Sequence, residues 1–499
     1  MRIYIVIRIE FKFAENKNGK VKKDSGESDY DKYVIVSNIS SLSLGTMIGW
    51  QSPTIPQLQS ENPPVGNEPM TNEAASWLTG ITCITAALTS LIVGTIANRF
   101  GRKMTGYLMA FALCSNWLFT TIATQQIYLF IARFFAGISG GMALFLVPLY
   151  VSEIASDGIR GMLGSLLVFL LNGGILLGYI LGALLSYRLF STIMLALPLL
   201  YIVLFPFVPE SPVYLLRRNR INEAARGGHK PTMEREMLRL QEDAKELDVP
   251  GRSTNKLSEM FRDQATIKGL FITLGLFGGQ QLAGIFVMIS YTEMIFKISG
   301  SSLSPNSSAI IVGVIQVFGS CLSTTLVERV GRRPLLLTSC LGMGTCHFVL
   351  GVFCYLQTLG YDVSQFSWIS IVALSVYMIT YGLGMGPGPY VISSEILSRD
   401  VASSIVTLGM FTAWGMAFVV VKLFPSVLAL LGIHGCFFLF GFFCATTFAF
   451  IFILIPETRG QPRQVILDRL NGVFYSLDNK QYVSSNEIAK RDTPLPELI

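Results

Sequence analysis

Apolar residues run through this chain in long stretches that few charged residues interrupt. One helical crossing of the hydrocarbon core of a bilayer needs about 20 such residues, and twelve stretches are of this length. They lie near 33–52, 75–97, 104–123, 127–151, 161–185 and 190–208, and near 266–291, 308–327, 334–356, 367–394, 401–424 and 433–455. The pattern predicts an all-α membrane protein with twelve transmembrane helices in two sets of six.

A charged stretch separates the two sets and divides the chain into two membrane halves. Its apolar residues recur at helical spacing among charges of both signs, which is typical of short surface helices. We therefore predict, in chain order, a disordered segment at 1–32, a six-helix half at 33–208, a helical linker at 209–264, a second six-helix half at 265–456 and a polar tail at 457–499.

Composition agrees with a membrane protein, and the charge distribution indicates its orientation. Hydrophobic residues make up 51% of the 499 residues and charged residues only 14%, whereas a soluble domain has about 25% charged residues. Loops that contain arginine alternate with loops that contain no basic residue, and basic loops stay in the cytosol. We expect a multi-pass protein of the plasma membrane with both termini and the linker in the cytosol.

Residues that carry catalysis or bind metals are scarce. The eight cysteines fall inside apolar stretches without metal-ligand spacing, and the chain has only three histidines. It contains no phosphate-binding glycine-rich loop, no nucleophile elbow and no basic domain for nucleic acid. The sequence therefore predicts that the chain is not an enzyme, has no cofactor or metal and binds no nucleic acid.

Three short motifs occur once in each set of six stretches and in the same order. They are Asn98–Lys103 and Glu328–Arg333 after the second and eighth stretches, Glu153–Ser156 and Glu395–Ser398 at the ends of the fourth and tenth, and Pro209–Ser211 and Pro456–Thr458 after the sixth and twelfth. Three matches in register indicate a duplicated six-helix unit. Such a repeat places a binding site near the membrane midplane, between the halves.

The motifs together resemble those of the sugar porters of the major facilitator superfamily, over roughly 33–460. Besides the two repeated basic loops, the resemblance rests on Arg133, Glu153, Arg160-Gly161, Pro209–Pro212, Gln280–Ile285, Gly386–Tyr390 and Pro456–Gly460. The stretch Gly45–Pro53 looks most like the facilitated trehalose and glucose transporters of insects. The resemblance implies the major facilitator fold and alternating access, with a small sugar and the lipid bilayer as partners and a monomer as the transport unit.

The repeated basic loops predict a gate on the cytosolic side. The planar fork of arginine holds a carboxylate pairwise, and Glu153 and Glu395 are the natural acceptors. We predict a latch that is closed when the site faces outward and broken when it faces inward. Its expected members are Arg99, Arg102, Arg133, Glu153, Arg160, Glu328, Arg329, Arg332, Arg333 and Glu395. The alternative is that these charges only set the orientation.

The two sides of this latch differ in sequence. Glu153 is followed seven residues later by Arg160, whereas Glu395 is followed at the same spacing by Ala402, with Arg399 at another offset. Either Arg399 takes the place of the missing arginine, or the latch is weaker in the second half. A weaker latch would bias the empty protein towards facing the cytosol.

Glycine and proline crowd the tenth stretch between Gly382 and Pro389. Inside a helix, glycine costs about 1 kcal/mol and proline about 3 kcal/mol, so this run predicts a break. We expect Gly386, Pro387 and Pro389 to form a gate on the extracellular side of the site. The alternative is a passive kink.

Side-chain amides, which both donate and accept hydrogen bonds, and aromatic faces recognise sugars. Polar residues inside a membrane usually face a cavity. Together with the resemblance, these rules point to a substrate site formed by Gln280, Gln281, Gln316, Tyr291, Tyr381, Tyr390 and Trp414. The alternative for the amides is that each one satisfies a carbonyl of a neighbouring helix.

Four positions depart from the sugar-porter pattern. Phe286 and Ala413 stand where the family usually has asparagine, Val168 where it has glutamine, and Tyr390 where it has tryptophan. Each lost amide removes a hydrogen bond worth about 0.5–1.5 kcal/mol. We therefore expect a site that is larger, more apolar or selective for another polyol.

Met47 stands where proton-linked sugar porters have aspartate, and no acidic residue lies deep in a predicted stretch. Because proton coupling needs a titratable group near the substrate, we favour facilitated diffusion of trehalose or a hexose. A proton-coupled porter of another polyol and a sugar-sensing receptor on a transporter frame are the alternatives. Asn306, in the sequon Asn-Ser-Ser, is the expected glycosylation site on an outer loop.

Overall fold

The computed structural model describes residues 27–154, 160–218, 220, 223, 264–301, 303–397, 399–461, 463–471, 473–475 and 482–484. The segment predicted to be disordered at 1–32 lies almost entirely outside these residues. Most of the predicted linker at 209–264 and much of the tail at 457–499 lie outside them as well.

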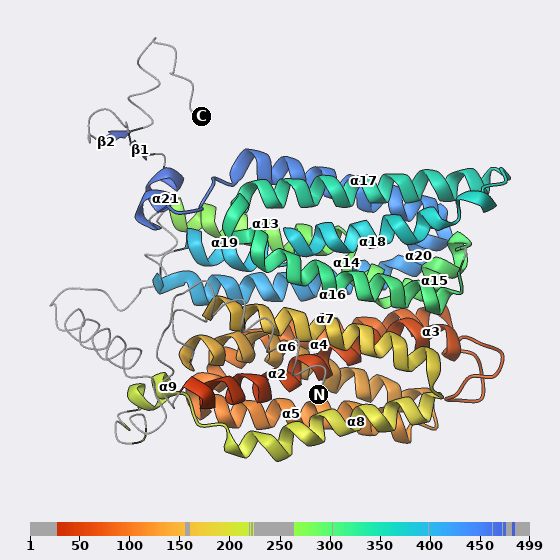
Figure 1. Cartoon of the computed structure of the whole chain (residues 1–499), viewed down its shortest axis with the longest axis horizontal. Helices are drawn as coiled ribbons and strands as arrows, with labels where there is room; N and C mark the ends of the chain where they lie inside the picture. Colours follow the sequence, from red (N-terminus) through yellow and green to blue (C-terminus); the bar gives the residue numbers. More distant parts are fainter. Residues whose placement is uncertain are drawn as a thin grey trace, which may run out of the picture.

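The N-terminal half consists of helices that run back and forth along a bundle (Figure 1). They are α2 (Glu27–Gly49), α3 (Gln51–Leu58), α4 (Asn72–Phe100), α5 (Arg102–Ile122), α6 (Gln126–Ile154), α7 (Arg160–Leu184) and α8 (Tyr187–Leu204), followed by the short η1 (Phe205–Phe207) and α9 (Pro212–Arg217). Gly101 separates α4 from α5 with a φ of 93°. This conformation strains any residue with a Cβ, so the glycine makes the tight turn possible.

The C-terminal half repeats this arrangement with two interruptions. Its elements are α13 (Gln264–Leu282), α14 (Ile285–Ser290), α15 (Thr292–Ser299), α16 (Pro305–Val330), α17 (Arg332–Thr358), η2 (Ser364–Phe366), α18 (Trp368–Leu383), α19 (Gly388–Ile396) and α20 (Arg399–Leu454), with α21 (Arg463–Leu470), β1 (Val473–Tyr475) and β2 (Tyr482–Ser484) after them. Gly284, in a left-handed conformation with φ 84°, ends α13. The continuous helix predicted at 266–291 is therefore wrong. Gly432, with φ 69°, divides α20 into two crossings.

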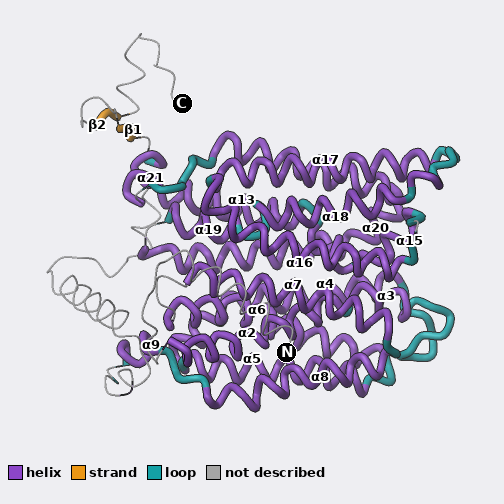
Figure 2. The backbone as a smooth tube through the Cα atoms, in the orientation of Figure 1, coloured by secondary structure: helices purple, strands orange, loops and turns teal. Residues whose placement is uncertain are grey.

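The two halves lie side by side along their length, with α2–α8 in one and α13–α20 in the other (Figure 1). Across the boundary, α4 packs against α20 and α7 packs against α16. Loops and turns gather at the two ends of the bundle (Figure 2). We call the end near α9 and α21 the latch end, and the end near α3 and α15 the loop end.

Glycines allow α2 and α7 to touch backbone to backbone within the N-terminal half. A Cβ at Gly45 would lie 2.1 Å from a backbone oxygen of α7, and a Cβ at Gly174 would lie 2.2 Å from a backbone oxygen of α2. Gly49 and Gly178 continue the contact one turn further. Small residues at this spacing let transmembrane helices approach closely, because no side chain stands between the backbones.

The outer surface of the bundle is apolar. Leu184, Phe207 and Leu430 are among its exposed side chains, and Leu430 is 82% exposed. Within the described residues, nine helical segments are long and apolar enough to cross a membrane, and one of them contains both crossings of α20. Each predicted stretch falls on helix. The all-α membrane class is confirmed, although the sequence did not predict the short antiparallel pair β1–β2.

Candidate substrate site between the two halves

The basic loop after α4 forms a buried ion-pair cluster at the latch end. Arg102 Nη2 lies 2.6 Å from Glu153 Oε1, and Arg102 Nε lies 2.9 Å from Glu153 Oε2. The backbone N–H of Arg102 donates to Glu210 Oε1 at 2.9 Å. The side chains of the pair are only 3% and 8% exposed. A bidentate pair of this kind fixes the relative positions of the helix ends that carry it.

The equivalent cluster in the C-terminal half is looser. Arg332 Nη2 lies 3.2 Å from Glu395 Oε1, and these side chains are 21% and 26% exposed. Glu457 accepts the backbone N–H groups of Arg332 and Arg333 at 3.1 and 3.2 Å, and the Thr458 hydroxyl donates to Glu395. Because water reaches this pair and screens it, loss of one partner costs less stability here than in the buried pair.

The ion pairs of the two repeated basic loops each join helices within one half. The Arg102 pair joins α5 to α6, and the Arg332 pair joins α17 to α19. Both pairs therefore brace the latch end of their own half. The prediction that they are closed when the site faces outward and broken when it faces inward stays a prediction.

The other predicted latch arginines serve different partners. The Arg99 guanidinium lies 5.5 Å from the centroid of the Phe100 ring, and Arg333 Nη2 donates to the Phe452 carbonyl at 2.6 Å. Arg99 therefore stays at the end of its own helix, whereas Arg333 ties the start of α17 to the latch-end part of α20. The side chains of four predicted residues lie outside the described part of the structure: Arg160, Glu328, Arg329 and Arg399.

Arg133 does not belong to the latch, which corrects the prediction. It lies about two turns from the loop-end start of α6, and it is fully buried. Its Nη1 donates to the Met47 carbonyl at 3.2 Å, and its Cζ lies 4.2 Å from the centroid of the Trp50 ring. The guanidinium therefore ties α6 to α2 inside one half. The residue at position 47 is methionine, so the guanidinium of Arg133 bonds its backbone carbonyl and finds no carboxylate there.

The run of glycine and proline interrupts the tenth crossing between α18 and α19, as predicted. A Cβ at Gly384 would lie 2.2 Å from the Leu335 carbonyl oxygen and 2.6 Å from Ser339 Cβ. Both neighbours belong to the first turns of α17, which begins at the latch end with Arg332. The break therefore lies towards the latch end, and its predicted place on the extracellular side is wrong.

Gln280 of α13 caps this break. The interrupted helix leaves carbonyls without helical partners, and Gln280 Nε2 donates to those of Met385 and Gly386 at 2.7 and 3.0 Å. Pro387 follows directly, and Pro389 lies in the first turn of α19. Gln280 therefore fits the alternative given for the amides, that each one satisfies a carbonyl of a neighbouring helix. Its side-chain N–H groups bond these carbonyls and hold the break in place.

Gln281 is the member of the pair with an acceptor left for a ligand. Its Nε2 donates to Gln280 Oε1 at 3.3 Å, and its Oε1 is buried without a described partner. Tyr381 accepts the Gly386 N–H through its carbonyl at 2.8 Å, beside the break. Tyr390, on α19, is 37% exposed and meets a buried phenylalanine ring edge-on.

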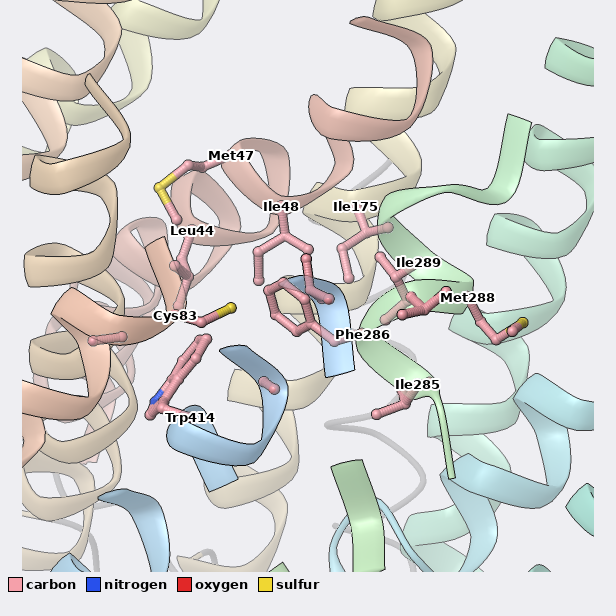
Figure 3. Packing of buried hydrophobic residues seen from close by; sticks show 14 of the residues in the cluster. Leu44, Met47, Ile48, Cys83, Ile175, Ile285, Phe286, Met288, Ile289 and Trp414 are labelled. Atoms are coloured by element: carbon pink, nitrogen blue, oxygen red, sulfur yellow. The ribbon is translucent and has the colours of Figure 1, made fainter. Parts of the chain in front are cut away.

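Phe286 and Trp414 fill the middle of the interface, with ring centroids 5.8 Å apart (Figure 3). Figure 3 shows Phe286 of α14 beside Ile48 of α2 and Ile175 of α7, so that this ring of the C-terminal half reaches the N-terminal half. All four side chains are buried. An apolar and aromatic surface therefore occupies the centre of the interface, where sugar porters usually have the amide that Phe286 replaces.

Tyr291 lies away from the glutamines with which it was grouped. It lines a pocket of about 140 Å³ at the loop end, together with Gln59 and Asn72 of the other half. Its ring centroid lies 5.2 Å from that of Phe424. Helix α14 separates this pocket from Gln281, so Tyr291 belongs to the loop-end closure.

Gln316 forms a hydrogen bond across the boundary to a residue that our sequence analysis missed. Its Nε2 donates to Asn172 Oδ1 at 3.0 Å, which links α16 to α7. A signal was present, because Asn172 is the single carboxamide in the stretch 161–185. An amide inside a membrane span is costly and usually functional.

Four further hydrogen bonds among the described residues join the halves towards the loop end. They are Lys422 with Ser76 at 3.0 Å, the Glu293 backbone N–H with Ser52 at 3.0 Å, Tyr179 with the Ile289 carbonyl at 2.7 Å, and Tyr179 with Thr292 at 3.1 Å. Lys422 Nζ also lies 4.3 Å from the centroid of the Trp77 ring, where a cation is attracted to the aromatic face. These contacts close the loop end.

The Glu293 carboxyl lies at this closure, where the backbone N–H of the same residue donates to Ser52. It lies beyond the membrane span Gln264–Ser290, and burial raises its pKa to about 7, while Lys297 acts in the opposite direction. When the halves separate at the loop end, the carboxyl regains water and its pKa falls towards the ordinary value of about 4.3. Closure is therefore favoured at acidic pH and is weakened as the pH rises through about 7.

We place a cysteine at position 428, in the loop-end pocket, and measure its reaction with an impermeant thiol reagent in the parent chain and in the Glu293→Gln variant. Dividing the parent rate by the variant rate at each pH cancels the ionisation of the thiol itself. We expect this ratio to be about tenfold higher at pH 8 than at pH 6. Glu73→Gln, at an exposed carboxyl of α4, is the matched control. A ratio that does not change with pH would exclude Glu293 as the titrating group.

The chain matches the family of sugar (and other) transporters over residues 20–466. It belongs to the sugar transporter family. The facilitated trehalose transporter of Anopheles gambiae is 30% identical over 442 residues, which cover 87% of this chain and 55% of the relative. That of Apis mellifera ligustica is 30% identical over 443 residues, which cover 87% of each chain. The chain spans only about half the length of the mosquito transporter and of several fly relatives.

Solved structures share the fold of this family member. The inward open xylose transporter XylE from E. coli aligns with a TM-score of 0.71 at 21% identity, over 88% of this chain and 99% of that one. XylE bound to 6-bromo-6-deoxy-D-glucose aligns with a TM-score of 0.70 at 24% identity, over 89% and 99%. The predicted sugar-porter family and the twelve-helix major facilitator fold are confirmed.

In this sugar transporter family member, four described residues are candidates for binding a substrate. Gln281, Gln316 and Asn172 bring amides, and Trp414 brings an aromatic face. Amides pair with hydroxyl groups in both directions, and the ring covers C–H surfaces. Because the set carries no charge, it suits a neutral polyhydroxyl compound.

Proposed function

We propose that this chain is a facilitative transporter that carries a small sugar, such as trehalose or a hexose, by alternating access. The family membership supports the substrate class. The fold supports the mechanism, because two internally braced halves meet along a boundary of separable contacts. On this basis the latch end and both termini face the cytosol, the loop end with Asn306 faces outward, and one chain in the plasma membrane is the transport unit.

The observation that carries the proposal is a set of uncharged amides, two of which meet across the boundary. Gln316 bonds Asn172 across the halves, and Gln281 Oε1 is buried without a described partner. Phe286 and Trp414 add an apolar surface at the middle of the interface. A sugar has hydroxyl groups around its rim and C–H groups on its faces, so it matches both parts. The apolar surface of Phe286 and Trp414 favours a sugar with extensive C–H faces.

Uniport is supported by the surroundings of Arg133. In a proton-coupled carrier a titratable carboxyl changes its charge within the membrane. Here the guanidinium meets the backbone carbonyl of Met47, a residue that does not titrate. Glu153 and Glu395 lie at the latch end, in ion pairs. Sugar movement would therefore follow the sugar gradient alone.

The test is uptake of labelled trehalose and of labelled glucose into oocytes that carry the chain at their surface. We expect uptake that saturates with sugar concentration and does not change with a protonophore. Gln281→Leu should raise KM about two- to tenfold, the equivalent of one hydrogen bond. Uptake of neither sugar, from protein shown to be at the surface, would contradict the proposal.

Gln357→Leu is the matched control for this experiment. It removes an amide of the same type, whose Nε2 donates to the Ser299 carbonyl at 2.9 Å within the C-terminal half, away from the boundary. KM should therefore stay unchanged in this variant. An equal rise of KM in Gln281→Leu and Gln357→Leu would indicate a general structural loss and would remove Gln281 from the site.

A further inference from the structure

Helix α7 packs against α16 of the other half along one of its faces, and we call this contact the seam. Towards the loop end, the Tyr179 hydroxyl donates to a backbone carbonyl of α14 at 2.7 Å. At Gly313 the helices approach so closely that a Cβ would lie 3.1 Å from Leu176 and from Tyr179. Asn172 lies one turn before Leu176 on the same face, and there Gln316 closes the seam with a 3.0 Å hydrogen bond.

The bond between Asn172 and Gln316 lies one turn further towards the latch end than these contacts. One turn further still on α7, Val168 is 40% exposed. A solute that enters from the latch end would therefore meet the two amides before it meets the contacts at Gly313 and Tyr179.

The chemistry of the two amides allows a hydroxyl group to replace their bond. The bond uses Gln316 Nε2 as donor and Asn172 Oδ1 as acceptor. A hydroxyl donates one hydrogen bond and accepts others. Placed between the amides, it accepts from Gln316 and donates to Asn172. One bond between the halves becomes two bonds to the sugar, and neither amide loses its partner.

We propose that a sugar replaces the hydrogen bond between Asn172 and Gln316, which holds the loop end shut in the empty carrier. Asn172 is then a substrate-binding residue and also a residue that links binding to movement. This inference rests on the proposed transport of a sugar. The empty carrier must break the bond before the halves separate at the loop end, whereas in the loaded carrier both amides stay bonded to the sugar. The loaded carrier therefore reorients faster than the empty one.

The first test needs no sugar. A cysteine at position 428, in the loop-end pocket, reports opening through its reaction with an impermeant thiol reagent. Asn172→Leu, which has nearly the same size, should speed labelling about two- to tenfold because it removes one hydrogen bond that holds the closed state. Gln316→Leu should act equally, and the double variant should add nothing, because both changes remove the same bond. Gln357→Leu should leave the rate unchanged.

The second test compares net uptake with exchange. In the parent chain, exchange with sugar on both sides should exceed net uptake, because net uptake includes the slow return of the empty carrier. In Asn172→Leu this ratio should fall towards one, while KM rises about two- to tenfold. A merely structural loss would lower both fluxes and keep their ratio.

The outcomes separate this inference from the proposed function. Unchanged labelling and an unchanged flux ratio in Asn172→Leu would overturn the inference even if the parent chain transports sugar. A parent chain that transports no sugar would reject the proposed function, and the labelling experiment would still decide whether the bond holds the loop end shut. Additive effects of Asn172→Leu and Gln316→Leu would show that the two residues do not act through one bond.

Discussion

Glu153→Gln is expected to destabilise the folded protein by about 3–5 kcal/mol, because it leaves the buried Arg102 guanidinium without its counter-charge. The equivalent change, Glu395→Gln, should cost no more than about 1 kcal/mol. The two glutamates hold corresponding positions in the repeat, so the changes are chemically identical. The difference arises from burial, since the Arg102 pair is almost free of water and the Arg332 pair is not.

Thermal unfolding of the two purified variants, compared with the parent chain in the same detergent, measures this difference. Arg102→Met combined with Glu153→Leu is the control, because it removes both charges and leaves none buried alone. This double variant should recover much of the stability that Glu153→Gln loses. Equal losses in Glu153→Gln and Glu395→Gln would contradict the argument, since they would mean that burial of the pair does not matter.

Gly174→Ala is expected to destabilise the protein by about 2–3 kcal/mol, whereas Gly173→Ala should be neutral or stabilise it by up to about 1 kcal/mol. The two variants add the same methyl group at adjacent positions of α7. At Gly174 the methyl carbon would lie 2.2 Å from a backbone oxygen of α2, and no side chain can move aside. At Gly173 it would meet nothing within 4 Å, and alanine favours the helix.

The measurement is again the thermal unfolding temperature, with surface expression as a second readout. Gly45→Ala, on the facing helix, should resemble Gly174→Ala, because its methyl carbon would lie 2.1 Å from a backbone oxygen of α7. If Gly174→Ala and Gly173→Ala unfold at the same temperature, α2 and α7 are free to separate by about an ångström without loss. The close backbone contact would then not be a source of stability.

Features that depend on neighbouring residues in the chain were predictable from the sequence. The twelve stretches follow from hydrophobicity, and the two halves follow from motifs that recur in register. Glu153 and Glu395 were predicted as acceptors for arginine, and in the structure they accept Arg102 and Arg332. The interruption after α18 follows from the backbone preferences of glycine and proline.

Features that depend on contacts between distant segments could not be predicted in this way. The sequence shows that Gln280 is an amide in a membrane span, but not that the carbonyls of Met385 and Gly386 lie within its reach. Arg133 was grouped with the latch from the family resemblance. Its distance along α6 shows instead that it lies near the other end.

Two features were visible in the sequence and were not used. Asn172 is the single carboxamide of its stretch, although sugar porters usually have their glutamine at the position of Val168. Gly45 with Gly49, and Gly174 with Gly178, have the four-residue spacing by which membrane helices pack closely. In the structure α7 contacts α2 on one side and α16 on another. The glycines form the contact with α2, and Asn172 bonds Gln316 of α16.

The glycine at position 432 joins the last two crossings without any intervening loop. Because the connection is this short, the loop-end ends of these two helices stay together. Lys422, ten residues earlier, carries the contact with Ser76 of the opposite half. Opening of that contact would therefore displace the last two crossings of the chain as one unit.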